Sequence, residues 1–513
     1  MPLQHLFIVY LIGTLIVFLP SFGFAKLFTK AGAPAWKAYV PFYNTWVMQE
    51  LAERPKHWVF WQFIPVVGWF ISPGIFIEFA KVFGKFSLAQ HTAATLGAPI
   101  YFPYLAYKED PKFIGAEGVK KHKKKNWREW VDAAIFAVVA ATLIRTFIFE
   151  AYTIPSSSME KTLLVRDFLF VSKLSYGPRI PNTPLSVPFV HNYLPFGSSR
   201  SSYSELIKIP YIRWFTTPVK RNDCVVFNFP EGDTVINRPG FQSAQPYYNF
   251  IRRSDGTINN EMREQILNSE PIAVHPVDKT DNYIKRCVAI AGDTLKIVNG
   301  ILYINGEKAF ISPTAATYYY FQSTKSINEY DLKDAGIKLN QEDGSSDFQP
   351  ISSTTYRINL TLPELEKLKA LNGVIASSIN PEIDSSAAGN VFPYNTNYFK
   401  WTVDNFGPLW VPKKGEKIQL TPENIVIYKR CICFYEHNTW EQKDGKIYIN
   451  GKEATEYTFK MNYYWMMGDN RHKSQDSRYW GFVSEDRVVG KAWMIWFSWE
   501  DGPRWKRLFS IVK

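Results

Sequence analysis

The sequence Ile154-Pro155-Ser156-Ser157-Ser158-Met159 follows directly after an apolar stretch at residues 130–149. Two later segments complete a pattern. They are Tyr283-Ile284-Lys285-Arg286 and a long polar loop at residues 468–481, which reads GDNRHKSQDSRYWG. A serine hydroxyl is a weak nucleophile that needs a base, and lysine can supply one only while its amine is neutral. A serine, a lysine and a polar loop behind an apolar helix therefore predict a membrane-bound serine protease with a lysine base.

Each of these features alone also has an ordinary structural explanation. A triple serine after proline is usually a turn, and a lysine in a strand usually lies at a solvated edge. A Gly-Asp-Asn-Arg stretch is usually a loop held by side-chain hydrogen bonds. Their joint occurrence, in this order after an apolar helix, is far less expected by chance. No Ser/His/Asp arrangement competes well, because the eight histidines are scattered along the chain.

Lys285 lies in a strand-like run at residues 282–290. Alternate residues of a strand share a face, so Tyr283, Lys285 and Cys287 would lie together while Arg286 points the other way. To act as a base, the lysine needs its reference pKa of about 10.4 lowered by roughly 3 units, which burial can supply. The pattern therefore predicts that apolar neighbours desolvate the Lys285 amine.

Over residues 129–500 the chain resembles the bacterial type I signal peptidases, also called leader peptidases. Residues 155–159 are similar to the serine box of that family, and residues 166–171, Arg-Asp-Phe-Leu-Phe-Val, resemble its next box. Its lysine box resembles residues 221–227 together with 283–286, and its last box resembles 468–481. Four boxes in the same order make this resemblance specific.

The resemblance implies that Ser158 is the nucleophile and Lys285 the general base. It implies an oxyanion hole made by the Ser158 backbone N–H and the Ser156 hydroxyl, and a donor of this kind is worth about 3 kcal/mol. The Ser474 hydroxyl would orient the lysine amine. Further supporting residues would be Tyr283, Asp476 and Arg478. Shallow pockets for small side chains, as in an Ala-x-Ala cleavage site, would be lined by Tyr152, Ile154, Pro155, Met159, Leu163 and Ile284.

Three positions depart from the pattern that the resemblance implies. Lys161 stands in place of a usual proline, which would loosen the turn after the nucleophile. Arg166 stands in place of a usual glycine, so a positive φ there would be strained. His472 stands where an aspartate is common. None of these changes removes a chemical group from the implied mechanism.

The chain beyond residue 150 has the short alternating runs of a mainly-β domain, at 168–171, 224–229, 283–290 and 294–304. Asn299-Gly300 predicts a hairpin turn, and residues 445–451 resemble residues 300–306, which predicts a second hairpin of the same kind. One helix is expected where Thr361-Leu362-Pro363-Glu364 forms a capping box, followed by a leucine stripe and Gly373. The predicted fold is a multi-span α-helical membrane anchor followed by a signal-peptidase-like β fold with large insertions.

The predicted organisation has seven parts. An N-terminal membrane extension with about three apolar segments precedes a basic cytoplasmic linker, and a membrane helix leads into the catalytic core. The first part of the core carries one insertion, a β-rich insertion follows, and the last part of the core precedes a C-terminal tail. In the same order, the boundaries are 1–110, 111–128, 129–150, 151–306 with insertion 231–280, 307–460, 461–500 and 501–513.

The apolar segments and their flanking charges predict how the chain crosses the membrane. Segments 4–25, 57–80, 86–107 and 130–149 are candidate spans, of which the second and third are weaker and could be re-entrant or interfacial. The net charge of +12 is concentrated in residues 1–128, which hold 15 Lys/Arg and 6 Asp/Glu, or +9 (15 − 6). A basic excess in short loops marks the cytoplasmic side. The positive-inside rule then places everything after residue 150 outside. Together with the resemblance, this implies the periplasmic face of the bacterial inner membrane.

The charge and the cysteine content indicate which classes of ligand and partner to expect. The basic charge has no nucleic-acid recognition motif beside it, so we expect no nucleic acid. The four cysteines are too few for a disulfide scaffold, and Cys431-Ile432-Cys433 has the wrong spacing for zinc with no histidine cluster beside it, so we expect no metal. The resemblance implies no cofactor. The implied partners are signal peptides of exported preproteins and membrane lipid, with the export channel as a further candidate.

The aromatic residues in 187–217 could dip into the outer leaflet or pack in a domain corner.

Two rival interpretations remain beside the signal-peptidase reading. One is a different serine/lysine protease, such as one that cuts itself, which the four-span anchor and several boxes disfavour. The other is a catalytically inactive membrane scaffold built on a peptidase domain. The presence of Ser156, Ser158, Lys285 and Ser474 disfavours the scaffold, because an inactive copy would be expected to lose one of them.

Overall fold

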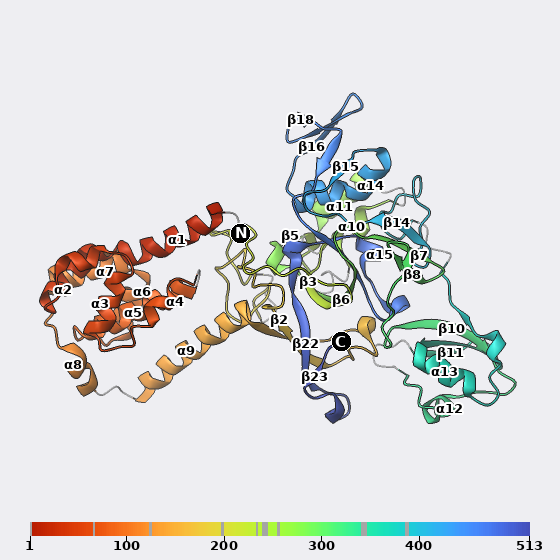
Figure 1. Cartoon of the computed structure of the whole chain (residues 1–513), viewed down its shortest axis with the longest axis horizontal. Coiled ribbons are helices and arrows are strands. Elements are labelled where there is room, and N and C mark those ends of the chain that lie inside the picture. The colour runs from red at the N-terminus through yellow and green to blue at the C-terminus, as the bar shows by residue number, and fades with distance from the viewer. Residues whose placement is uncertain are drawn as a thin grey trace. The chain divides into compact units, whose positions relative to one another are not determined.

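The chain forms two compact units, Met1–Leu143 and Ile144–Lys513. The computed structural model describes residues 3–64, 67–122, 126–195, 200–231, 234–238, 245–253, 257–339, 346–384 and 389–513. The first unit is helical, and the second is mainly β with a few short helices (Figure 1). The change from helices to strands falls near residue 150, as the sequence predicts.

The second unit is built around an antiparallel sheet of eight strands. Their order is β1-β2-β22-β3-β6-β20-β21, with β23 paired to β22. Strand β22, from near the C-terminus, lies between β2 and β3, so the end of the chain completes the sheet that its first strands begin. The bounds are β1 (Phe149–Thr153), β2 (Asp167–Ser172), β3 (Cys224–Asn228), β6 (Asn282–Ala289), β20 (Tyr463–Met467), β21 (Val483–Ser484), β22 (Val488–Ser498) and β23 (Ser510–Ile511).

A second sheet contains the hairpin that Asn299-Gly300 predicts. Both turn residues have positive φ, which matches the right-handed twist of the flanking strands. The order is β14-β7-β8-β9, and the aromatic ring of Phe406 on β14 lies 5.3 Å from that of Trp465 on β20, inside the largest core cluster. The bounds are β7 (Thr294–Val298), β8 (Ile301–Ile304), β9 (Glu307–Lys308) and β14 (Phe406–Trp410). Part of the predicted insertion 307–460 therefore pairs with a strand of the predicted core.

A third sheet, here called the β10–β12 sheet, lies within residues 316–381 and has the order β11-β12-β10-β13. It forms a lobe of its own with two helices (teal in Figure 1). Helix α13 begins after Thr361 with the predicted capping box and ends before Gly373. The bounds are β10 (Ala316–Gln322), α12 (Glu329–Asp334), β11 (Phe348–Pro350), β12 (Thr355–Thr361), α13 (Leu362–Ala370) and β13 (Asn380–Pro381).

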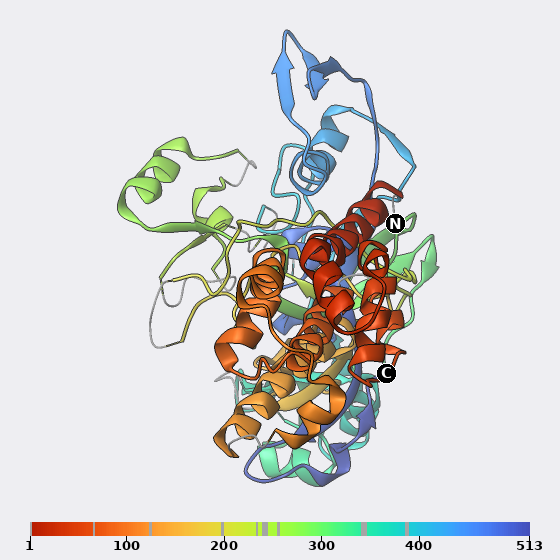
Figure 2. The ribbon, with the colours of Figure 1, turned by 90° about the vertical axis from the view of Figure 1, so that its left-hand side faces the viewer.

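Two further projections extend from this unit. One is the strand pair β4–β5 with two helices, which falls in the predicted insertion 231–280, and the other is the meander β16–β17–β18, the second predicted hairpin. Figure 2 shows both, in yellow-green and blue. The bounds are β4 (Thr234–Ile236), α10 (Tyr247–Ile251), α11 (Asn260–Ser269), β5 (Ile272–Val274), β15 (Lys417–Gln419), α14 (Pro422–Arg430), β16 (Trp440–Lys443), β17 (Lys446–Ile449), β18 (Lys452–Glu453), β19 (Glu456–Thr458) and α15 (Ser477–Trp480).

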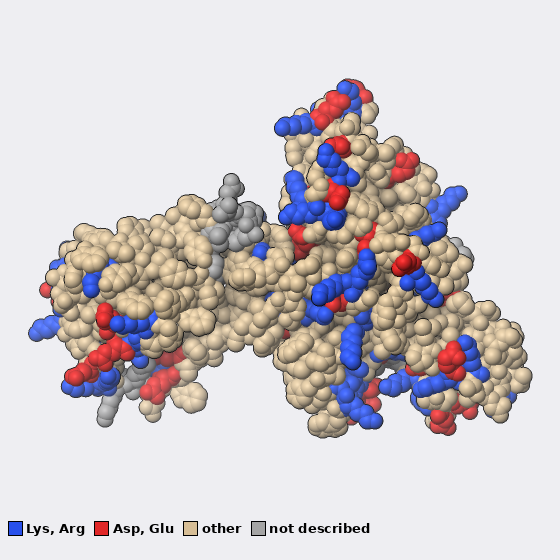
Figure 3. All heavy atoms as spheres, viewed as in Figure 1, with Lys and Arg blue, Asp and Glu red and all other residues tan. Residues whose placement is uncertain are grey.

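The first unit is a cluster of short helices with an aromatic core. Phe24, Phe76, Phe79 and Phe102 are buried together with their rings in edge or tilted contact. In Figure 3 much of the visible face of this unit carries no charge, and charged side chains gather at its lower edge. The bounds are α1 (Leu3–Phe18), α2 (Ser21–Lys30), α3 (Tyr43–Leu51), α4 (Trp58–Trp61), α5 (Val67–Lys81), α6 (Leu88–Leu96), α7 (Ala98–Tyr104) and α8 (Gly115–Lys121).

Among the described residues, one helix is long and apolar enough by itself to cross a membrane. It is α9 (Asn126–Phe147), 22 residues long, in which an 18-residue window has a mean hydropathy of 1.6. Residues 4–25 do not form one straight helix, because the chain bends by 46° between Tyr10–Phe18 and Ser21–Lys30, at Pro20; the bent pair counts as a second span if it crosses as one. Segments 57–80 and 86–107 are divided into shorter helices, so the multi-span anchor stays a prediction.

The aromatic residues of 187–217 do not all face the same environment. Phe189 and Phe215 are exposed, whereas Trp214 is buried and stacks on Phe147. Tyr193 and Tyr203 both bind the ring of one buried histidine, His275. Phe196 lies outside the described residues. The segment thus combines corner packing with exposed aromatic rings.

Candidate active site

Ser158 lies in the serine turn, residues 154–166, which joins β1 to β2. Two backbone hydrogen bonds close its base, from Ile154 N–H to Asp167 O and from Arg166 N–H to Ile154 O, both 2.9 Å. Lys161 and Arg166 adopt φ of +69° and +62°. This left-handed conformation costs a non-glycine residue about 1–2 kcal/mol, so the strain expected for a positive φ at Arg166 is present.

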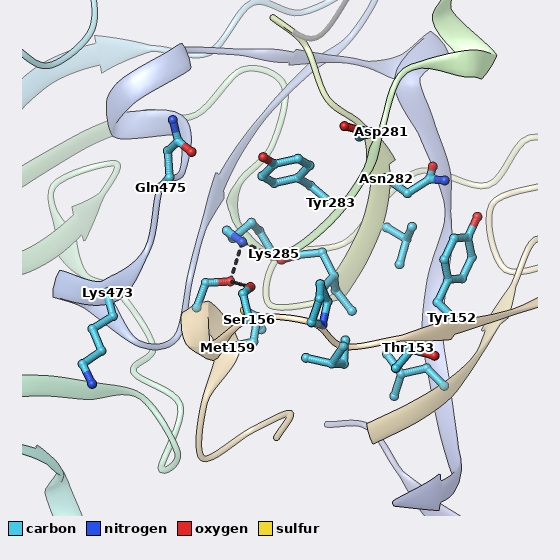
Figure 4. Close-up of a pocket in the computed structure, with 16 residues that line it drawn as sticks. Tyr152, Thr153, Ser156, Met159, Asp281, Asn282, Tyr283, Lys285, Lys473 and Gln475 are labelled. Carbon is cyan, nitrogen blue, oxygen red and sulfur yellow. Dashed lines mark hydrogen bonds between the residues drawn. The ribbon is translucent and has the colours of Figure 1, made fainter. Parts of the chain in front are cut away.

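Lys285 reaches the serine from β6, between β3 and β20. Its Nζ lies 2.8 Å from Ser158 Oγ and also donates to Ile284 O over 3.0 Å (dashed lines in Figure 4 mark the serine contacts). The side chain is only 3% exposed. Burial lowers the pKa of Lys285 to about 8, although the Asp476 and Asp469 carboxylates oppose the shift. The prediction of a desolvated lysine beside the serine therefore agrees with the geometry.

Two further predicted residues flank this pair. Ser156 Oγ lies 3.4 Å from Ser158 Oγ, so both hydroxyls border the same small volume. The ring of Tyr283 lies 5.5 Å from Lys285 Nζ and stacks on Phe229. Figure 4 shows Tyr283 and Ser156 on opposite sides of the lysine amine.

The polar loop at 468–481, here called the support loop, is organised by Asp476. This fully buried carboxylate accepts hydrogen bonds from Gly468 N–H and from the Arg478 guanidinium. Burial alone would raise its pKa, but Arg478 holds the pKa of Asp476 below the usual range. Ser474 Oγ is buried beside Asp476 and makes no hydrogen bond to Lys285 in this structure. The predicted Ser474–lysine contact is therefore absent here.

Three buried residues that the sequence interpretation did not assign connect the support loop to β6 and to the serine turn. Asp469 forms a bidentate ion pair with Arg286, with distances of 2.8 and 2.6 Å. The Asn470 backbone N–H donates to Ser158 O, and its side-chain amide donates to Ser157 O, both over 3.1 Å. Asn470 and Asp469 follow Gly468 within the quoted loop, so their position beside the support residues was the available signal.

A cleft of about 560 Å³ opens beside the two serines and the lysine. Of the predicted pocket residues, all but Leu163 line it; Leu163 is buried behind the cleft against Ile154 and Met159. Tyr152 is held by a hydrogen bond from its hydroxyl to Glu150, and it lies across the cleft from Gln475 (Figure 4). The lining residues that the sequence analysis did not assign are Thr153, Leu169, Val226, Asp281, Asn282, Lys473 and Gln475.

Two of these additional residues follow from strand pairing. Leu169 is the cross-strand partner of Tyr152, and Val226 is the partner of Ile284. Directly paired residues share a face of the sheet, so both belong to the same wall of the cleft. The register that brings them there is not readable from either strand alone.

The four cysteines, none of which contributes to the cleft, are all unpaired thiols.

Comparison with known families identifies the family of this chain. The family described as "Signal peptidase, peptidase S26" matches residues 127–354 and 413–499. The chain belongs to this family. A member of it is a serine peptidase, and the buried Ser158 with its neighbouring amine fits that class. Residues 36–116 match a second family, DUF5684, which is described as of unknown function.

Curated relatives agree with the family match. Signal peptidase I of Buchnera aphidicola subsp. Acyrthosiphon pisum is 25% identical over 77% of this chain and 85% of its own length. Signal peptidase I of Haemophilus influenzae is 24% identical over 74% of this chain and 75% of its own. Signal peptidase I of Helicobacter pylori strain J99 is 24% identical over 75% of this chain and 91% of its own length. The chain is thus similar to bacterial type I signal peptidases along most of their length.

Proposed function

We propose that this protein removes signal peptides from exported preproteins, with Ser158 as nucleophile and Lys285 as general base. The observation that carries the proposal is the 2.8 Å separation of Lys285 Nζ and Ser158 Oγ in a buried site at the end of a cleft. An amine with a pKa of about 8 is partly neutral at physiological pH, so it can accept the serine proton. The curated relatives described above are named signal peptidase I, which supports the same substrate class.

The proposed reaction runs in two stages. Neutral Lys285 takes the proton of Ser158 as Oγ attacks the scissile carbonyl carbon, and the resulting ammonium then protonates the leaving amine as the C–N bond breaks. The signal peptide remains as an ester on Ser158. Lys285 next takes a proton from a water that attacks this ester, and returns it to Oγ when the ester bond breaks. The same amine therefore serves as base and acid in each stage.

The neighbouring residues supply charge stabilisation and shape. We assign the oxyanion hole to the Ser158 backbone N–H and the Ser156 hydroxyl, because Ser156 Oγ already borders the Ser158 oxygen. We propose that the buried Ser474 hydroxyl turns toward the lysine amine when substrate is bound. Asp476 and Arg478 would hold the support loop, and Tyr283 would cover the lysine. We propose that the part of the cleft lined by Tyr152, Pro155 and the remaining lining residues accepts small side chains at the cleavage site.

The protein is proposed to act at the periplasmic face of the inner membrane as a multi-pass protein. Helix α9 ends at Phe147, close before Ser158, so membrane anchoring would hold the cleft near the bilayer. Impermeant thiol labelling of cysteines introduced at Lys120 and Lys413 tests the orientation. We expect labelling in intact cells only at Lys413; labelling at Lys120 would reverse it.

The exposed rings of Phe189 and Phe215 give the membrane proposal a second test. We propose that they insert into the outer leaflet, where amphipathic aromatic segments are favoured. Detergent-free vesicles would be mixed with the soluble region carrying Phe189→Ser and Phe215→Ser, and with the parent. Equal vesicle binding by the two would show that these rings do not contact lipid.

The deciding experiment is mass spectrometry of a detergent-solubilised preprotein after incubation with the parent, Ser158→Ala and Lys285→Ala proteins. Cleavage after a small-x-small site by the parent alone is the expected result. Equal cutting by Lys285→Ala would reject the lysine base. A folded parent that cuts nothing would instead favour the inactive scaffold.

A further inference from the structure

The β10–β12 sheet has no role in the proposed reaction, yet it contacts both loops of the active site directly. The Ala316 N–H on β10 donates to Asp469 O over 2.8 Å, and Ala316 forms a parallel bridge with Asn470. Thr162 in the serine turn also hydrogen bonds Thr314, just before β10. One sheet therefore touches the support loop and the serine turn together.

The shortest connection to the nucleophile passes through Asn359 of β12. Its side-chain amide donates to Asn470 Oδ1 over 2.9 Å, and Asn470 in turn donates to the backbone oxygens of Ser157 and Ser158. Asn359 and Asn470 are both fully buried. Two hydrogen-bonded steps thus link the sheet to the carbonyl of the residue that carries the nucleophile.

A second connection starts inside the serine turn. Lys161 lies three residues after Ser158 and, despite its strained φ, its Nζ donates to Asn359 O over 3.0 Å. The same amine forms a 2.6 Å ion pair with Glu364 at the start of α13. The loosening expected from the absence of proline at position 161 is therefore offset by a tie to the sheet.

The contacts between the sheet and the active-site loops are polar and buried, unlike an interface that only packs two lobes together. Burying an asparagine or a lysine costs free energy unless its polar atoms are paired, so a face that needs only adhesion is better made from apolar side chains. Here Lys161 donates to the backbone oxygen of Asn359 on β12, and the Asn359 side chain donates to Asn470, which in turn donates to the turn beside the nucleophile. The arrangement restrains backbone positions.

We propose that the β10–β12 sheet is a positioning element for the peptidase reaction, acting through Asn359 and Lys161. The inference rests on the proposed roles of Ser158 and Lys285. By fixing the backbone of the serine turn, the two residues would hold Ser158 Oγ and its N–H in register with the lysine amine. Neither residue lines the cleft, so neither is expected to contact substrate.

The test compares variants of the full-length protein in detergent. Asn359→Leu removes both side-chain donors at similar volume, and Lys161→Met removes the cation while keeping the stem. We expect kcat to fall about tenfold or more in each, with KM nearly unchanged, because small displacements of reacting groups cost rate rather than binding. Lys161→Arg should recover much of the loss.

A matched control is available in the same sheet. Arg357 of β12 forms an ion pair with Glu382, and Glu382 is not a partner of either catalytic loop. Glu382→Gln should therefore keep the parent kcat. Thermal unfolding of every variant separates a change in rate from a loss of folded protein. Lys161→Met supplies the answer if Asn359→Leu does not fold.

Hydrogen exchange of peptides covering 154–166 gives a readout that needs no catalysis. We expect faster exchange in Asn359→Leu and Lys161→Met than in the control. Parent-like kcat and exchange in both variants would overturn the proposal, as would a kcat loss that only follows the loss of folded protein. If the parent itself cuts no preprotein, the proposed function fails, and exchange alone then decides whether the sheet restrains the turn.

Discussion

Lys285 and Arg286 are neighbours on one strand, both almost fully buried, yet their surroundings give them opposite properties. Lys285 has a serine hydroxyl and one carbonyl as partners, with carboxylates acting only from a distance, so burial lowers its pKa to about 8. Burial would also lower the pKa of Arg286, but the paired Asp469 raises it. The comparison shows that the direct partner, and not burial itself, decides whether the pKa of a buried basic side chain is lowered or raised.

The largest contrast is expected when each cation is replaced by methionine. Lys285→Met should reduce kcat by at least about 10⁴-fold, because loss of one member of a catalytic unit removes nearly all of its effect. The free energy of unfolding should stay near the parent value or rise, since no paired carboxylate is left behind. Peptidase assays with denaturant unfolding measure both. A variant that retains activity would remove the lysine from the mechanism.

Arg286→Met should produce the complementary result. It leaves the Asp469 carboxylate buried without its guanidinium, which costs about 3–5 kcal/mol in the free energy of unfolding. Chemical denaturation of the protein in detergent measures the loss. The double variant Arg286→Met with Asp469→Asn should recover part of the stability, and an absence of recovery would show that the ion pair is not the cause.

Replacing Ser156 tests whether its hydroxyl, beside the Ser158 oxygen, stabilises charge during the proposed reaction. Ser156→Ala should lower kcat by about 10²–10³-fold with little change in KM, because the hydroxyl would stabilise charge that develops only in the transition state. Steady-state kinetics on a preprotein substrate provide the measurement. Ser175→Ala, outside the cleft, is the matched control. A Ser156 variant with the control's kcat would place the oxyanion hole elsewhere.

The pH dependence gives the smallest and most graded effect. The reactive form of Lys285 is neutral, so kcat/KM should fall about tenfold for each pH unit below about 8 and level off above it. Arg286 remains charged throughout this range and contributes no slope. Rates measured from about pH 6 to 10 in one ionic strength test the prediction. A flat profile below 8 would mean that the lysine is already neutral or is not the base.

Part of the site was readable because its chemistry is local. The order of the boxes made Ser158, Lys285 and Asp476 candidates, and strand alternation predicted a buried lysine face. Hairpins such as Asn299-Gly300 were readable for the same reason, since a two-residue turn has few conformations. Leu169 and Val226 were not assigned, because their place in the cleft depends on which strands pair and in what register.

The membrane part shows the limit of apolar runs as a guide. Composition alone predicted several candidate spans, and α9 has the length and hydropathy of one. The bend at Pro20 and the division of 57–80 and 86–107 into short helices depend on backbone geometry and on packing around Phe24 and Phe79. An apolar residue serves a lipid-facing surface and a protein core equally well.

By itself, the sequence determined the family resemblance, the change from helices to strands near residue 150, and the residues of the candidate site. These depend on residue type and short spacing, which the chain carries locally. Only the tertiary structure decided that Lys285 lies 2.8 Å from Ser158, that Arg286 pairs with Asp469, and that Asn359 reaches the support loop. Such contacts join segments far apart in the chain, so they exist only once the sheets have paired and packed.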